Sequence, residues 1–164
     1  QSGIIQALQQ TLIDIAFTVS FSEPFVNLNP ITDDSELEWI VTSTHHQCAV
    51  FHYDHPMANN NYINMKDLIK ENFVIPDPQE MTPGCPIIVA YSKYVSGLLL
   101  MVNCKMGITI LPVTSKRLSP PTVRFIKIDN TKHFVQNSIT WKKSNQNPCL
   151  HYFIDETKLL LPNI

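Results

Sequence analysis

Residues 99–112 read LLMVNCKMGITILP, and this stretch decides the fold. Its first half belongs to an apolar helix, and Gly107 is suited to end that helix. Residues 108–112 then have the apolar, β-branched composition of a buried strand. Another short strand at 86–91 precedes the helix, with Ser92 placed as the helix cap. Strand, helix, glycine and strand in this order predict a βαβ crossover and an α/β fold.

Alternating helices and strands continue on both sides of this unit. Residues 37–53 are extended, and the polar break at 44–47 leaves two interpretations, two joined strands or one long bent strand. Asn64 is expected to cap a short helix through Ile69. The last helix is expected to start with Asn147 as cap and Pro148 at its first position. Its predicted buried face consists of Leu150, Phe153, Ile154, Thr157 and Leu160. The other predicted elements are a helix at 4–12 and strands at 13–19, 72–76, 123–128 and 138–142.

Composition narrows the function classes. The 164 residues are 44% hydrophobic and 16% charged with a formal net charge of −2, as in an ordinary globular protein. The basic residues are scattered, so bulk electrostatics does not indicate a nucleic-acid binder. No apolar run approaches the roughly 20 residues that span a bilayer, and we expect no membrane association. Four widely spaced cysteines favour reduced thiols in a cytoplasmic protein.

A cluster of histidines with one cysteine invites a metal or catalytic interpretation: His45, His46, Cys48, His52 and His55. On an extended strand, His46, Cys48 and His52 share one face, and zinc accepts such ligands. No second paired motif supports a metal site, and nothing supplies an oxyanion hole or orienting acid for a nucleophilic Cys48. We therefore expect no metal, no cofactor and no enzymatic activity.

The order of motifs resembles the effector-binding domain of LysR-type transcriptional regulators. Residues 7–17 resemble the family's "L..G.LDLA" segment, with Thr11 near its usual glycine. Residues 54–58, DHPMA, resemble its "HPLA" turn, and residues 65–76 its "L.DL…PFVLP" stretch. Residues 99–112 resemble "LVAAGLGIALLP", the most specific piece, and residues 139–153 resemble the family's ending.

This resemblance implies a two-lobed, periplasmic-binding-protein-like fold of type 2, with a hinge of two crossing strands. Residues 1–60 and 137–164 would form the first lobe, which lacks a counterpart for the family's first strand and helix. Residues 61–136 would form the second lobe, shorter than the family by roughly a helix between Pro76 and Pro86.

The same resemblance implies an effector-sensing and dimerisation domain that binds a small, anionic molecule between the lobes. Helix N-termini favour carboxylates, although Asp77 would oppose an anion. The implied ligand-binding residues are Ser2, Thr18, Val19, Pro76, Asp77, Ser92, Gly107, Ile108 and Thr109. Each also has an ordinary interpretation, such as a cap for Ser92 and a helix stop for Gly107.

The implied partners are a small-molecule effector, a second copy of the chain, and DNA only through a helix-turn-helix domain absent from this sequence. The alternative is a free-standing solute-binding protein of the same fold, which would need an export signal upstream. The reduced-looking cysteines argue against that alternative.

Overall fold

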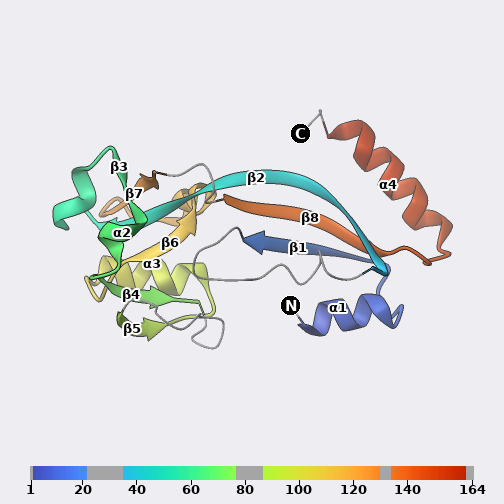
Figure 1. The fold of residues 1–164 in the computed structure, drawn as a ribbon, viewed down its shortest axis with the longest axis horizontal. Helices are drawn as coiled ribbons and strands as arrows, with labels where there is room; N and C mark the ends of the chain where they lie inside the picture. The colour runs from blue at the N-terminus through green and yellow to red at the C-terminus, as the bar shows by residue number, and fades with distance from the viewer. Residues whose placement is uncertain (1, 22–34, 77–86, 130–133, 162–164) are drawn as a thin grey trace. The chain divides into compact units, whose positions relative to one another are not determined.

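The computed structural model of the chain describes residues 2–21, 35–76, 87–129 and 134–161 (Figure 1). These residues divide into two compact units, one made of 2–21, 35–44 and 136–161, the other of 45–76, 87–129 and 134–135. Both contain helices and strands, which confirms the α/β class. Along β2, the first unit ends at residue 44 and the second begins at residue 45. The sequence predicted a border between the lobes near residue 60, and that lobe assignment stays a prediction.

Strand β2, Leu37–His52, is a single strand of 16 residues, so the alternative of one long strand holds. Its polar stretch at 44–47 is where the two units change over. The second element shared by both units is β8, Phe134–Lys142, which starts four positions before the predicted strand.

The first unit places three strands between two helices. Its strands lie in the order β1 (Ile15–Phe21), β8 and β2, and its helices are α1 (Ser2–Gln9) and α4 (Pro148–Leu160). Successive residues of a strand face opposite sides of the sheet. Ile15 packs in the cluster that contains α4, and Ala16 in the cluster that contains α1. The two helices therefore cover opposite faces of the strands, as Figure 1 shows.

Helix α1 ends at Gln9, earlier than the predicted end at residue 12. Strand β1 starts at Ile15, two residues after the predicted start at residue 13. Between them Thr11 adopts φ 58°, in the left-handed region that favours glycine. Its N–H donates to the Leu8 carbonyl at 3.0 Å, and the Leu12 N–H donates to the Ala7 carbonyl at 2.9 Å. Thr11 thus performs the helix-ending role for which a glycine would be better suited.

Helix α4 begins as predicted. The Asn147 side chain accepts from the Cys149 N–H at 3.0 Å, and Pro148 occupies the first turn. Of the expected buried face, Leu150 and Ile154 are buried, but Phe153 and Leu160 are exposed, so that part of the prediction was wrong. Within the described residues, α4 buries a narrow stripe against β8, where it meets Ile139 and Trp141.

The second unit is built around β2, whose later half pairs antiparallel with β6 (Thr109–Pro112) and β7 (Val123–Ile128). Strand β7 pairs in parallel with β3 (Tyr62–Ile63), and β4 (Asn72–Ile75) pairs in parallel with β5 (Ile87–Tyr91). The helices are η1 (Pro56–Asn59), α2 (Met65–Leu68), α3 (Val95–Asn103) and η3 (Val113–Leu118). Asn64 precedes α2 as expected, but its side chain makes no capping hydrogen bond.

The predicted crossover has an extra strand inside it. Phe73 of β4 forms a parallel bridge with Ile108, while β4 also pairs with β5. Strand β4 therefore lies between β5 and the start of β6. Helix α3 connects β5 to β6 and so passes across β4.

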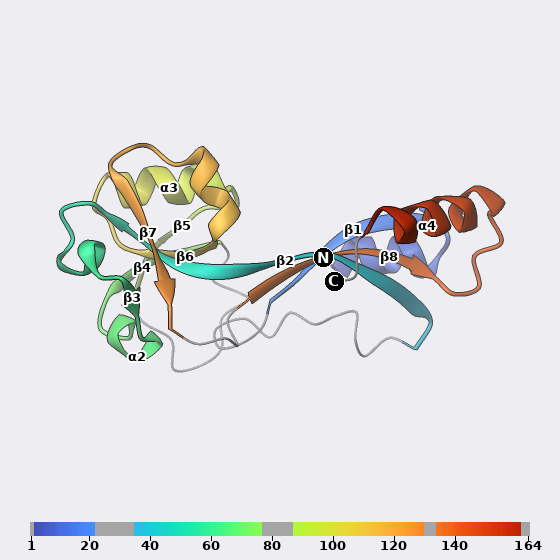
Figure 2. The same ribbon diagram turned by 90° about the horizontal axis from the view of Figure 1, so that it is seen from above.

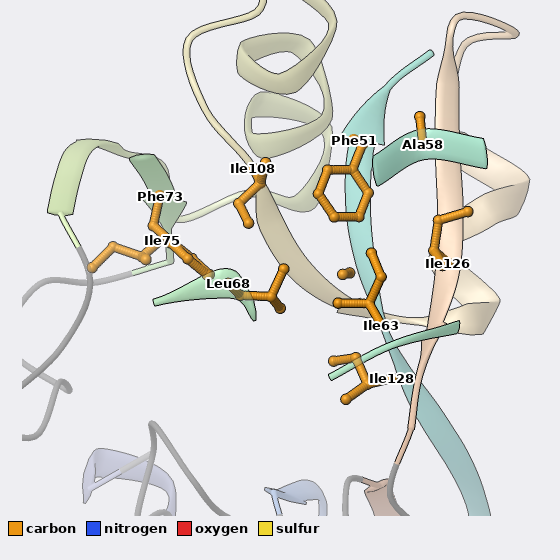
Figure 3. Packing of buried hydrophobic residues seen from close by; sticks show 10 residues of the cluster. Phe51, Ala58, Ile63, Leu68, Phe73, Ile75, Ile108, Ile126 and Ile128 are labelled. Atoms are coloured by element: carbon orange, nitrogen blue, oxygen red, sulfur yellow. The ribbon is translucent and has the colours of Figure 1, made fainter. Parts of the chain in front are cut away.

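Two apolar cores lie on opposite faces of the second unit. Ala49 and Phe51 face a cluster with α2 and β7, which Figure 3 shows around Leu68, Ile108 and Ile126. Val50, between them, faces a cluster with Leu98, Leu99 and Val102 of α3. Helices α2 and α3 accordingly lie on opposite sides of the strands (Figure 2). No helix in the described ranges has both the length and the apolarity to cross a membrane.

Candidate functional site

The sequence-predicted ligand residues fall in both units. Ser2 is the first residue of α1, and Thr18 and Val19 lie in β1. The second unit contains Pro76, Ser92, Gly107, Ile108 and Thr109. Asp77 lies outside the described residues.

Pro76 and Ser92 lie together at one edge of the second unit. Each directly follows a strand, β4 or β5, and Ile75 is the register partner of Tyr91 in this parallel pair. The Ser92 N–H donates to the Ile75 carbonyl at 3.0 Å. Helix α3 starts at Val95, three residues after Ser92, so its N-terminus lies near this edge. Carboxyl ends of parallel strands beside a helix N-terminus form the usual place for a ligand in α/β folds.

Ser92 does not cap α3, so that prediction was wrong. The cap residue is Tyr94, which offers no side-chain capping bond. Ser92 instead closes a small turn before the helix, because its Oγ accepts from the Tyr94 N–H and donates to the Tyr94 carbonyl, both at 3.2 Å. The first N–H groups of α3 thus lack a side-chain cap, and such groups bind carboxylates and phosphates.

Gly97 keeps the Ser92 side chain close to the first turn of α3. A Cβ added at Gly97 would lie 2.2 Å from the Ser92 Oγ and 2.9 Å from its Cβ. The hydroxyl is therefore held against the helix start, half-buried, by the absence of a side chain at residue 97.

Gly107 and Ile108 lie at the other end of β4 and do not join Pro76 and Ser92. The Ile108 N–H donates to the Asn72 carbonyl at 2.7 Å, and the Val74 N–H donates to the Ile108 carbonyl at 2.8 Å. A Cβ on Gly107 would lie 2.6 Å from the Asn72 carbonyl oxygen, so the glycine is required for this close approach of two strands.

Thr109 and Thr18 are buried within their own units. Thr109 is 1% exposed and pairs with Val50 across β6 and β2. The Thr18 Oγ1 lies 2.7 Å from the Thr140 Oγ1 and 3.4 Å from the Ser138 carbonyl oxygen, inside the sheet of the first unit. Both threonines therefore have structural roles that the sequence interpretation did not specify.

The structure also contains a cavity that the sequence did not predict. Its volume is about 420 Å³, and residues from three segments of the second unit line it: His52, Asp54, His55, Pro56, Lys70, Glu71, Asn72, Lys105, Met106, Gly107 and Ile108. The Lys105 Nζ donates to the Asp54 Oδ2 at 2.6 Å. This hydrogen bond lowers the pKa of Asp54 below its ordinary value and raises the pKa of Lys105, so both groups are charged near neutral pH.

The hydrogen bonds fix the tautomer of His55. Its Nδ1 accepts from the Met57 N–H at 3.2 Å, as the N-cap of η1. The proton is therefore on Nε2, which donates to the Glu71 Oε2 at 3.3 Å. His55 thus links the turn after β2 by a hydrogen bond to Glu71, the residue before β4.

The histidine and cysteine cluster does not form a metal site. Among the described residues, no group of three or more His, Cys, Asp or Glu could hold a metal ion. Cys48 is buried in β2, and burial raises the pKa of its thiol above the ordinary value, which disfavours the nucleophilic thiolate.

Comparison with known proteins gives the fold. No family model matches the chain. The C-terminal domain of a probable LysR family regulator from Rhodococcus sp. RHA1 superposes with a TM-score of 0.74 at 17% identity, over 96% of this chain and 80% of that one. The BenM effector-binding domain with its effector benzoate gives 0.71 at 14% identity, over 98% and 74%. The chain has the LysR effector-domain fold. This confirms the predicted two-lobed α/β class of the periplasmic-binding-protein type.

One curated relative is similar in sequence. The uncharacterized HTH-type transcriptional regulator YnfL of Escherichia coli strain K12 is 27% identical over 122 residues, which are 64% of this chain. The chain spans 40% of the length of that relative.

Proposed function

We propose that this chain is the effector-sensing part of a LysR-type transcriptional regulator and has no enzymatic activity. The observation that carries the proposal is the LysR effector-domain fold over 96% of the chain, together with a sequence relative among helix-turn-helix regulators. A neighbour of this fold binds benzoate as its effector, which favours a small carboxylate as ligand.

The edge formed by Pro76, Ser92 and the start of α3 is the part of the second unit that suits such a ligand. The uncapped N–H groups of α3 would hold the carboxylate, and the helix dipole favours its negative charge. The Ser92 hydroxyl adds a donor and acceptor beside them. Of the residues that the resemblance implies in the first unit, Ser2 and Val19 stay proposals, whereas the Thr18 hydroxyl already bonds to Thr140 inside the sheet.

The same proposal includes the partners. A second copy of the chain would form an isologous dimer, and DNA would be bound by a helix-turn-helix domain elsewhere in the whole protein. Such a regulator would act in the cytoplasm. Effector binding would act by shifting the population of two states that differ in ligand affinity.

A thermal-shift screen with small carboxylates, amino acids and aromatic acids tests the proposal. A ligand that binds only the folded state raises the melting temperature by mass action. We expect a carboxylate hit that Ser92→Ala weakens. Ser119→Ala is the matched control, because Ser119 follows η3 in the same unit and its hydroxyl donates to the Lys116 carbonyl. A ligand panel without any hit, or equal weakening by both variants, would contradict the proposed site.

A free-standing solute-binding protein of the same fold is the alternative. The reading frame upstream of Gln1 discriminates the two, because the regulator requires a helix-turn-helix there and the transport protein an export signal. An export signal with no helix-turn-helix would overturn the proposal.

A further inference from the structure

We propose that the cavity beside His52 and Lys105 is a second binding site, for a small anion with carboxylate or phosphate oxygens. It lies wholly inside the second unit and uses neither Pro76 nor Ser92. The proposal does not rest on the regulatory function, because it follows from the donors that line this cavity.

His52 provides the first unused donor. Its side chain is only 10% exposed, and its Nδ1 accepts from the Asp54 N–H at 3.2 Å. In the neutral ring the proton is therefore on Nε2. The Asp54 Oδ2 lies 3.6 Å from Nδ1, which is an ion pair only when the ring is protonated. In the described part of the chain, Nε2 has no hydrogen-bond partner, yet no buried side-chain nitrogen or oxygen there lacks one. The Nε2–H is therefore accessible to solvent, and His52 is one of the residues that line the cavity.

Two lysines supply positive charge at the same cavity. The Lys105 ammonium uses one of its three donors on Asp54 and remains 60% exposed. Lys70 is exposed and also lines the cavity. Ammonium groups and an imidazole N–H form charge-assisted or neutral hydrogen bonds with anionic oxygens.

Each carboxylate at the cavity has a partner inside the protein. Asp54 accepts from Lys105, and Glu71 accepts from the Nε2–H of His55. Their negative charges are offset by Lys70 and Lys105, so an approaching anion meets no net like charge from these side chains. Two N–H donors of Lys105, the ammonium of Lys70 and the Nε2–H of His52 remain for a ligand, and these are the groups that an anion would engage.

The volume agrees with a small-molecule site. About 420 Å³ lies inside the range of roughly 300–1,000 Å³ typical of ligand pockets. Met106 and Gly107 form part of the wall, and Gly107 must be glycine because of the nearby Asn72 carbonyl.

Two-dimensional NMR with acetate, inorganic phosphate and acetamide at constant ionic strength tests this inference. We expect saturable shifts of the His52 ring and of the Gly107 and Ile108 amides with acetate or phosphate. A stronger response to acetate identifies a carboxylate ligand, and a stronger response to phosphate a phosphate ligand. Equal shifts with neutral acetamide, or no saturable shift with either anion, would overturn the proposal.

Variants locate the binding. We expect His52→Phe and Lys105→Gln each to weaken anion binding by roughly tenfold, since hydrogen bonds with charged groups contribute strongly. Phe retains the ring that packs beside Tyr53, and Gln retains a donor for Asp54, so both variants should fold. Lys66→Met is the matched control, an exposed lysine of α2 outside the cavity. Equal loss in Lys66→Met would show nonspecific charge attraction and contradict the site.

Discussion

The hydroxyl oxygens of Thr18 and Thr140 lie 2.7 Å apart between β1 and β8, where Thr18 is 6% and Thr140 0% exposed. A hydroxyl without a partner in such a place is costly, so Thr140 requires Thr18, while Thr18 also donates to the Ser138 carbonyl at 3.4 Å. The pair lies on the α1 side of the sheet, because Thr18 shares its face with Ala16. This pair explains the burial of a polar residue that the sequence alone suggested as a ligand contact.

The stability losses from replacing the two members of this pair should therefore not be additive. We expect Thr18→Val to lower the free energy of unfolding by about 1–3 kcal/mol, since Thr140 loses its partner. In the double variant Thr18→Val, Thr140→Val, the second substitution should cost less than it does alone. Urea unfolding of the four proteins measures this coupling, and strictly additive losses would contradict the hydrogen bond.

Replacing Thr11 by glycine should increase the free energy of unfolding. A residue with a Cβ at φ 58° pays roughly 1–2 kcal/mol for the left-handed conformation. Thr11→Gly removes that cost but raises the conformational entropy of the unfolded chain. We therefore expect a net gain of about 0.5–1 kcal/mol in unfolding free energy. Thr11→Ala keeps a Cβ and should give no such gain. If alanine stabilised as much as glycine in thermal or urea unfolding, the strain at Thr11 would not be the cause.

Asp14 should make the fold sensitive to acid. Hydrogen bonds from Asn145 at 2.8 Å and Asn147 at 2.9 Å lower the pKa of its carboxyl below the ordinary value of 3.8. A lowered folded-state pKa contributes stability above the unfolded value, and this contribution is lost as the pH falls through the lowered pKa. Carboxyl NMR titration should therefore give a midpoint below 3.8.

The neighbouring asparagines provide the control for that titration. Asn145→Ala should raise the Asp14 pKa towards its ordinary value, because the largest cause of the shift is removed. An unchanged midpoint in this variant would show that the asparagine does not stabilise the carboxylate.

Gly107 should not tolerate a side chain. A Cβ would lie 2.6 Å from the Asn72 carbonyl oxygen, which is backbone and is held by the Ile108 N–H. We expect Gly107→Ala to lower the free energy of unfolding by about 1–3 kcal/mol, as overpacking does. Gly3→Ala is the control, since no atom lies within 4 Å of a Cβ there. Urea unfolding of both variants checks this, and equal stability would contradict the close approach.

The local elements were predictable, and the long-range contacts were not. Asn147 and Pro148 at the start of α4 are short-range signals that the sequence shows directly. Gly107 was expected to end α3, but that helix ends at Asn103 and Lys105 takes the left-handed conformation with φ 60°, so that prediction was wrong. The Asp54–Lys105 ion pair joins residues 51 positions apart, so no spacing rule could place them around one cavity. Ser92 was placed as a cap because serine prefers that position, but its hydroxyl bonds within a turn instead.

The exposure of α4 shows the same limit. Its apolar spacing predicted a broad buried face, but Leu160 is 79% exposed. Sequence periodicity identifies the apolar side of a helix, and only packing decides how much of that side is covered.

The most direct test of the central claim is NMR mapping with the carboxylate that raises the melting temperature most. We predict the largest saturable amide shifts at Ser92 and at residues 95–97, with affinity reduced by Ser92→Ala and unchanged by Ser119→Ala. Absence of a saturable response to any carboxylate, or shifts that leave these residues unaffected, would contradict an effector site at the start of α3.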